Sequence, residues 1–126
     1  MTPDLDRWSA EVMGWVRYPK YDDRKDFEWV VKTGPHAFMP VMDEWQWHPS
    51  QDANQVFMVV YRLLEQGFHY KLGDNVPPPI HYCEFWKYES DRLIEGRAFN
   101  MNPNLAILQA AHAALGQQER EARDGR

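Results

Sequence analysis

Trp45-Gln-Trp-His-Pro-Ser-Gln-Asp52 joins two tryptophans to the start of a helix, and so sets the middle of the fold. Ser50 is a suitable N-cap, and Asp52 falls in the first turn, where a negative charge interacts favourably with the helix dipole. An apolar stripe with helical spacing follows, made of Val56, Val59, Val60, Leu63 and Leu64. Gly67 is a stop signal, so the pattern predicts a helix between Ser50 and Gly67.

The chain before this segment predicts a helix and a β-hairpin. Thr2-Pro3 is a cap residue followed by proline at the first helical position, and the helix should end between Trp15 and Arg17 because Gly14 weakens it. Its apolar residues are Leu5, Trp8, Val12 and Trp15. Residues 27–32 then read as a strand, 33–36 as a turn and 37–39 as a second strand that Pro40 limits.

The chain after the middle helix predicts strands and a last helix. Strands are expected at 68–72, at 81–88 and at the sheet edge over 93–99, with a stiff loop at Val76–Pro79. In the clearest strand, alternation places Tyr82, Glu84, Trp86 and Tyr88 on one face and Cys83 and Phe85 on the other. Asn102-Pro103 starts an alanine-rich helix that carries Leu105, Leu108, His112 and Leu115, and that Gly116 should end.

These elements predict an α+β fold, with one mainly antiparallel sheet of about four or five strands covered by three helices, as in an α/β/α sandwich. We expect a single domain over residues 1–116 and a charged, frayed tail over 117–126.

Three parts of the sequence resemble the phage ABA sandwich family: the Met13-Gly-Trp15 end of the first helix, the Trp-x-Pro-Ser-x-Asp run over 47–52, and the alanine-rich last helix. The resemblance spans about residues 5–116. It implies a small phage or prophage protein with a sheet between helical layers. It carries no general catalytic mechanism, and the Val76–Pro79 loop and the many aromatics look like local elaborations.

Composition limits the classes of function. The chain of 126 residues has 14 Lys and Arg against 19 Asp and Glu, which argues against a duplex nucleic-acid binder. The single Cys83 fits a reducing compartment. The start lacks the pattern of a signal peptide, and no long apolar run suggests a membrane span, so we expect a cytoplasmic protein. The resemblance to a phage family implies that this cytoplasm is that of the bacterial host.

No motif predicts catalysis, a cofactor or a metal site. The five histidines lack ligand spacing, Cys83 has no activating cation nearby in sequence, and no glycine-rich loop is built to hold a phosphate. Paired acids such as Asp22-Asp23 and Asp43-Glu44 are read as solvated loop charges. We therefore expect a protein that is not an enzyme.

The candidate ligand-binding residues fall in two places. Trp86 and Tyr88, with Arg92 and Arg97 just beyond, would offer stacking planes and anion donors in one neighbourhood. Trp47 and His48 would lie at the helix N-terminus, where free backbone N–H groups favour an anion. The alternatives are that the strand aromatics form sheet core and that the tryptophans anchor the loop.

Three functions remain open on the sequence. The first is a non-catalytic module that captures a small host-derived ligand, with a nucleotide immune signal as its concrete form in a phage protein. The second is a factor that binds and inhibits or redirects a host protein, and the third is an enzyme whose site has no recognisable motif. A concave aromatic pocket would favour the first and a flat exposed patch the second. A homo-oligomer is also open, because the alanine-rich helix could pack against a symmetry mate.

Overall fold

The computed structural model describes residues 4–21, 26–75 and 80–124. Its helices are α1 (Leu5–Val12), α2 (Ala53–Glu65) and α3 (Pro103–Asp124), with a short 3₁₀ helix, η1 (Glu44–Gln46), before α2. Its strands are β1 (Val16–Pro19), β2 (Phe27–Gly34), β3 (Ala37–Asp43), β4 (His69–Asn75), β5 (Ile80–Glu89) and β6 (Arg92–Asn100). The expected α+β class is confirmed, and the expected loop at 76–79 lies outside the described residues.

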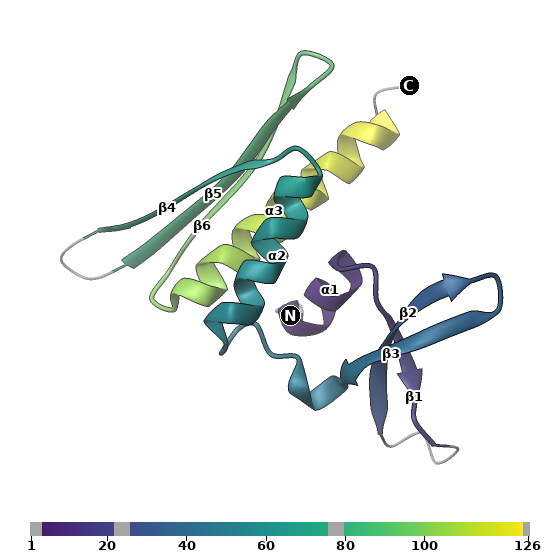
Figure 1. Cartoon of the computed structure of the whole chain (residues 1–126). Helices are drawn as coiled ribbons and strands as arrows, with labels where there is room; N and C mark the ends of the chain where they lie inside the picture. Colours follow the sequence, from purple (N-terminus) through teal and green to yellow (C-terminus); the bar gives the residue numbers. More distant parts are fainter. Residues whose placement is uncertain (1–3, 22–25, 76–79, 125–126) are drawn as a thin grey trace.

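The strands form two sheets, so the expected single sheet of four or five strands is wrong. β1, β2 and β3 pair antiparallel in that order, and so do β4, β5 and β6. The helices lie between the two sheets, which reverses the expected layering of a sheet between helices (Figure 1). The cause is the path of the chain: η1 and α2 lead away from the first sheet, and α3 packs on β5 and β6 of the second.

The ends of α1 differ from the sequence expectation. Asp4 is the N-cap, and its carboxylate accepts a hydrogen bond from the Arg7 backbone N–H at 3.1 Å. The expected cap, Thr2, lies outside the described residues. The helix ends at Val12, before the predicted end, because Gly14 has φ +86° and turns the chain into β1.

The middle helix has the predicted stripe, in which Val56, Val59, Val60 and Leu63 are completely buried. Its N-cap is Asp52, which accepts a hydrogen bond from the Gln55 N–H at 3.1 Å, and not Ser50 as expected. Ser50 donates instead to the Asp6 carboxylate, from its N–H at 2.8 Å and from its hydroxyl at 2.7 Å. The segment 45–52 therefore ties α1 to α2.

In the first sheet, β3 continues past Pro40 to Asp43, so the expected short strand is wrong. The pairing shifts between Trp29 and Val30, which face Met42 and Pro40, and this leaves Val41 as an extra residue. β3 is an edge strand, where proline costs no hydrogen bond within the sheet.

The last helix packs closely on β6. Gly96 is the contact point: a Cβ there would lie 2.2 Å from the Ala114 backbone nitrogen and 2.4 Å from the Ala110 carbonyl oxygen. Asn102 caps the helix as predicted, accepting a hydrogen bond from the Asn104 N–H at 2.9 Å. The buried side chains that surround the helices include Trp29, Trp47, Phe68, Phe85, Ile94, Ile107 and Leu108.

The helix end that we expected at Gly116 is wrong, because α3 continues to Asp124. Contacts with β6 hold the extension. The Gln117 side chain bonds to the backbone of Leu93 and Glu95, and Glu121 accepts a hydrogen bond from Arg92 at 2.6 Å. These tertiary contacts outweigh the weak helix propensity of glycine.

Candidate functional site

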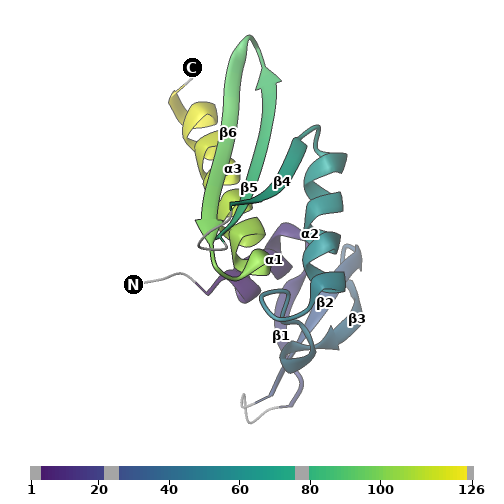
Figure 2. The same ribbon diagram turned by 90° about the vertical axis from the view of Figure 1, so that its left-hand side faces the viewer.

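The second sheet has one buried face and one open face. Cys83, Phe85 and Ile94 point toward α3 and are almost completely buried, as strand alternation predicted for Cys83 and Phe85. We call the opposite side, which points away from α3, the outer face. Figure 2 looks onto this face, and no described helix or strand lies in front of β5 and β6 there.

The outer face is built from three cross-strand rows, because residues opposite each other in antiparallel strands point to the same side. The first row is His69, Trp86 and Glu95, the second is Lys71, Glu84 and Arg97, and the third is Gly73, Tyr82 and Phe99. The rows thus place aromatic rings beside two cations that flank one carboxylate.

A hollow of about 400 Å³ opens over the second and third rows. It is lined by Lys71, Gly73, Asp74, Tyr82, Arg97 and Phe99. Gly73 keeps it open, because no atom lies within 4 Å of the place where its side chain would be. The rings of Tyr82 and Phe99 form one wall, with centroids 4.9 Å apart and planes tilted by 41°.

A hydrogen bond holds the Tyr82 hydroxyl at the edge of this hollow. The Tyr82 hydroxyl donates to the Glu84 carboxylate at 2.6 Å. This bond raises the pKa of Tyr82, burial raises it further, and Arg97 acts in the opposite direction. Glu84 is thus engaged by Tyr82, and the hollow has a cationic side chain on each side of it, Lys71 on β4 and Arg97 on β6.

The predicted strand residues divide between the two faces. Trp86 and Arg97 share the outer face, and the Trp86 ring lies 5.7 Å from that of His69. Tyr88 is on the same face, beyond the hollow, and is 73% exposed. Arg92 pairs with Glu89, on the α3 side, and forms an ion pair with Glu121, so its expected place in this neighbourhood is wrong.

Sequence reasoning missed five residues of the hollow: Lys71, Gly73, Asp74, Tyr82 and Phe99. The available signal was Gly73 itself, because a glycine inside a strand marks a place where another group can approach closely. The alternating pattern instead predicts a strand that ends at residue 72, just before this glycine.

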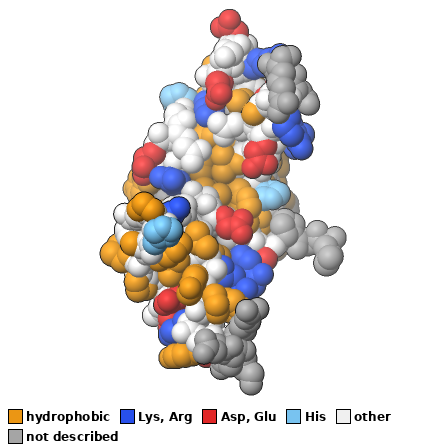
Figure 3. Space-filling view, turned by 90° about the vertical axis from the view of Figure 1, so that its right-hand side faces the viewer, with side chains coloured by type: hydrophobic (Ala, Val, Ile, Leu, Met, Phe, Trp, Pro, Cys, Tyr) orange, Lys and Arg blue, Asp and Glu red, His pale blue; other side chains and the backbone are white. Residues whose placement is uncertain are grey.

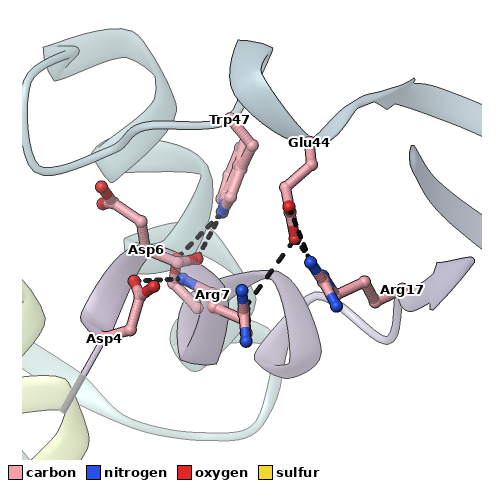
Figure 4. Close-up of polar contacts among 7 residues, drawn as sticks. Asp4, Asp6, Arg7, Arg17, Glu44 and Trp47 are labelled. Carbon is pink, nitrogen blue, oxygen red and sulfur yellow. Dashed lines mark hydrogen bonds and ion pairs between the residues drawn. The ribbon is translucent and has the colours of Figure 1, made fainter. Parts of the chain in front are cut away.

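Trp47 and His48 are not part of this face. The Trp47 ring is buried, and its Nε1–H donates to the Asp6 carbonyl and to the Ser9 hydroxyl, both at 3.0 Å (Figure 4). Trp15 packs edge-on against it, with ring centroids 4.8 Å apart. His48 donates its backbone N–H to the Gln55 side chain at 2.7 Å. The loop-anchor interpretation holds for Trp47, whereas Trp45 is 74% exposed.

A charged cluster joins α1, β1 and η1. The Arg17 guanidinium bonds to both carboxylate oxygens of Glu44, and the Arg7 Nε lies 3.8 Å from the same carboxylate (Figure 4). A hollow of about 220 Å³ adjoins it. Nearby, the Lys20 ammonium pairs with Asp43 at 2.9 Å, which lowers the pKa of that carboxyl. These cations already have carboxylate partners, so the cluster acts first as a structural tie.

The described part of the chain offers little support for nucleophilic or metal chemistry. Burial raises the pKa of the Cys83 thiol to about 12, so the thiolate needed for nucleophilic chemistry is disfavoured. Within residues 4–21, 26–75 and 80–124, no three His, Cys, Asp or Glu side chains gather in a way that could hold a metal ion. Over the same residues, every helix is too short or too polar to span a bilayer.

Comparison with known proteins gives no relative: no family model, curated protein or solved structure matches this chain.

Proposed function

We propose that this protein is a non-catalytic binding module that takes a small ligand carrying a flat ring and an anionic group, such as a nucleotide, in the hollow beside Gly73. One observation carries the proposal: the rings of Tyr82 and Phe99 meet Lys71 and Arg97 around a position that has no side chain. Aromatic rings stack on bases, and arginine and lysine bind phosphate oxygens.

The charges suggest how such a ligand would lie. Its ring would stack on the exposed Phe99 side chain, and its phosphate would approach Arg97 and Lys71. Glu84 and Asp74 add negative charge at the same hollow, which disfavours ligands with many phosphates. A nucleotide with one or two phosphate charges therefore fits better than a polyphosphate or a nucleic-acid duplex.

A biological role follows only through the resemblance to the phage ABA sandwich family. In a phage or prophage protein inside the bacterial cytoplasm, capture of a host nucleotide signal would block the defence response that depends on it. We propose this role as the concrete form of the binding activity.

Isothermal titration calorimetry with a panel of mononucleotides, cyclic nucleotides and dinucleotides tests the proposal. We expect saturable binding of at least one member, and a loss of about tenfold or more in affinity for Arg97→Ala. Gly73→Leu should abolish binding by filling the hollow.

Tyr88→Ala is the matched control, because Tyr88 is an exposed aromatic on the same face outside the hollow. It should bind as the unaltered chain does. The absence of saturable binding across the panel, or equal loss in the control and in Gly73→Leu, would contradict the proposal.

A second candidate, binding of a host protein, is favoured by the first sheet. Hydrophobic side chains gather on the lower part of the molecule in Figure 3, over β1 to β3. Val16, Tyr18 and Phe38 are each about half exposed, and the rings of Tyr18 and Phe38 lie 6.1 Å apart. Exposed apolar patches are common at protein interfaces. A Tyr18→Ser, Phe38→Ser double variant that keeps nucleotide binding but loses a host partner would support this candidate.

A further inference from the structure

β6 forms a free edge of the second sheet. It is nine residues long, contains no proline and has β5 on one side only. Backbone groups of alternate residues point to opposite sides of an antiparallel strand. The Glu95 N–H and the Leu93 carbonyl bond to the Gln117 side chain and not to β5, which shows that the odd-numbered residues of β6 direct their backbone groups outward.

The part of this edge nearest the start of α3, around Arg97 and Phe99, is open to another strand. Among the described residues, no side chain is hydrogen-bonded to the outward N–H or carbonyl of Arg97 or Phe99. These backbone groups can therefore pair with another strand. Long edge strands that lack a proline and a bulge, as β6 does, are templates for strand addition.

The side chains of β6 complement a second copy of β6. If two copies run antiparallel with Gly96 opposite Gly96, Glu95 lies opposite Arg97 of the mate, and Leu93 lies opposite Phe99. By symmetry each pair occurs twice. Opposite charges and apolar pairs that lie directly across from each other stabilise a pair of antiparallel strands, and like charges destabilise it.

The neighbouring registers are disfavoured. A register centred on Glu95 puts two glutamates opposite each other, and a register centred on Arg97 puts two arginines opposite each other. A slip by one residue would place outward side chains opposite residues that face α3, such as Ile94. Of these registers, only the one centred on Gly96 satisfies both charge and facing.

We propose that a second copy of this chain adds its β6 to this edge, antiparallel and centred on Gly96, so that the two second sheets become one. α3 packs on both β5 and β6. The two copies of α3 would then lie side by side behind the joined sheet, at the close spacing of packed helices. The exposed, small Ala113 lies beside Gly96 and permits this approach.

Gln117 competes with the second copy. Its amide makes the two hydrogen bonds, at 3.0 and 3.1 Å, that a partner strand would make to Glu95 and Leu93. In the pair of copies, the backbone of the mate's β6 replaces it. Removal of this side chain by Gln117→Ala should therefore strengthen association.

Sedimentation-velocity ultracentrifugation over a range of concentrations, without ligand, tests the proposal. The chain should form dimers, and Glu95→Arg or Arg97→Glu alone should raise the dissociation constant about tenfold or more, because each variant creates two like-charge pairs. The double variant Glu95→Arg, Arg97→Glu should restore dimerisation.

Lys71→Glu is the matched control, since Lys71 shares the outer face and its row with Arg97 but lies on β4, at the opposite edge. It should dimerise like the unaltered chain. Hydrogen exchange should also slow at the Arg97 and Phe99 amides as concentration rises. A chain that stays monomeric, a double variant that is not restored, or equal weakening by the control would overturn the proposal. Nucleotide binding does not enter this assay, so its result is independent of the proposed function.

Discussion

Substitution of Gly96 by alanine is the sharpest probe of how α3 is held on the second sheet. The added Cβ would lie 2.2 Å from the Ala114 nitrogen, 2.4 Å from the Ala110 oxygen and 2.8 Å from the Ala113 carbonyl carbon. All three atoms belong to the helix backbone. No side-chain rotation can therefore relieve the overlap, and the helix itself must move.

The size of the effect follows from that geometry. Restoring ordinary contact at 3.4 Å from 2.2 Å requires a local separation of about 1.2 Å between helix and strand. Overpacking a well-packed interior costs about 1–3 kcal/mol. Because a whole helix must shift and lose its packing on β5 and β6, we expect the upper end, about 3 kcal/mol, and a fall in Tm of roughly 10 °C.

Urea unfolding followed by tryptophan fluorescence measures this loss. Gly73→Ala is the control, because a Cβ there meets no atom within 4 Å and alanine is favoured over glycine in a strand. The control should match or exceed the unaltered chain by about 0.5 kcal/mol. If Gly96→Ala unfolds within about 0.5 kcal/mol of the unaltered chain, the close packing of β6 on α3 is refuted.

Three further predictions concern single groups. Trp47→Phe removes both hydrogen bonds from its Nε1 to α1 and should lower the free energy of unfolding in urea by about 1–3 kcal/mol; an unchanged value would contradict the anchoring role. Cys83 should react with a thiol reagent roughly 100-fold or more slower in the folded chain than in urea; equal rates would contradict its burial. The raised pKa of Tyr82 means that the unfolded chain loses this proton first, so the stability due to Tyr82 is present below its ordinary pKa of 10.0 and is lost as pH rises toward the folded value. Glu84→Gln should make unfolding in urea less dependent on pH in that alkaline window, and an unchanged dependence would contradict the Tyr82–Glu84 bond.

Sequence predicted the elements whose patterns are strong and local. The alternation over 81–88 gave the right faces of β5, and the apolar stripe gave α2. β1 was missed because four residues ending in Pro19 carry too short a pattern. The division into two sheets and the extension of α3 past Gly116 depend on contacts between distant segments, which no local pattern contains.

In the candidate site too, local patterns were predicted correctly, whereas features that depend on pairing between strands were not. Strand alternation placed Trp86 with the other outward residues of β5. Arg92 was misplaced because the predicted strands stop at residue 88 and begin again at residue 93, which leaves Arg92 outside both. The turn has two residues, Ser90 and Asp91, with φ of 52° and 64°, and this pairs Arg92 with Glu89 on the inner side. The hollow depends on the register of β4 against β5, which places Gly73 opposite Tyr82. This register cannot be predicted from the pattern of either strand alone.

Residue-resolved chemical-shift mapping by NMR, during titration with the tightest nucleotide of the panel, tests the binding role of the outer face most directly. The proposed function predicts saturable shifts that centre on Gly73, Tyr82, Arg97 and Phe99 and leave the first sheet unchanged. Saturable shifts that centre on the first sheet or on the Arg17–Glu44 cluster, or no saturable shifts at all, would contradict it.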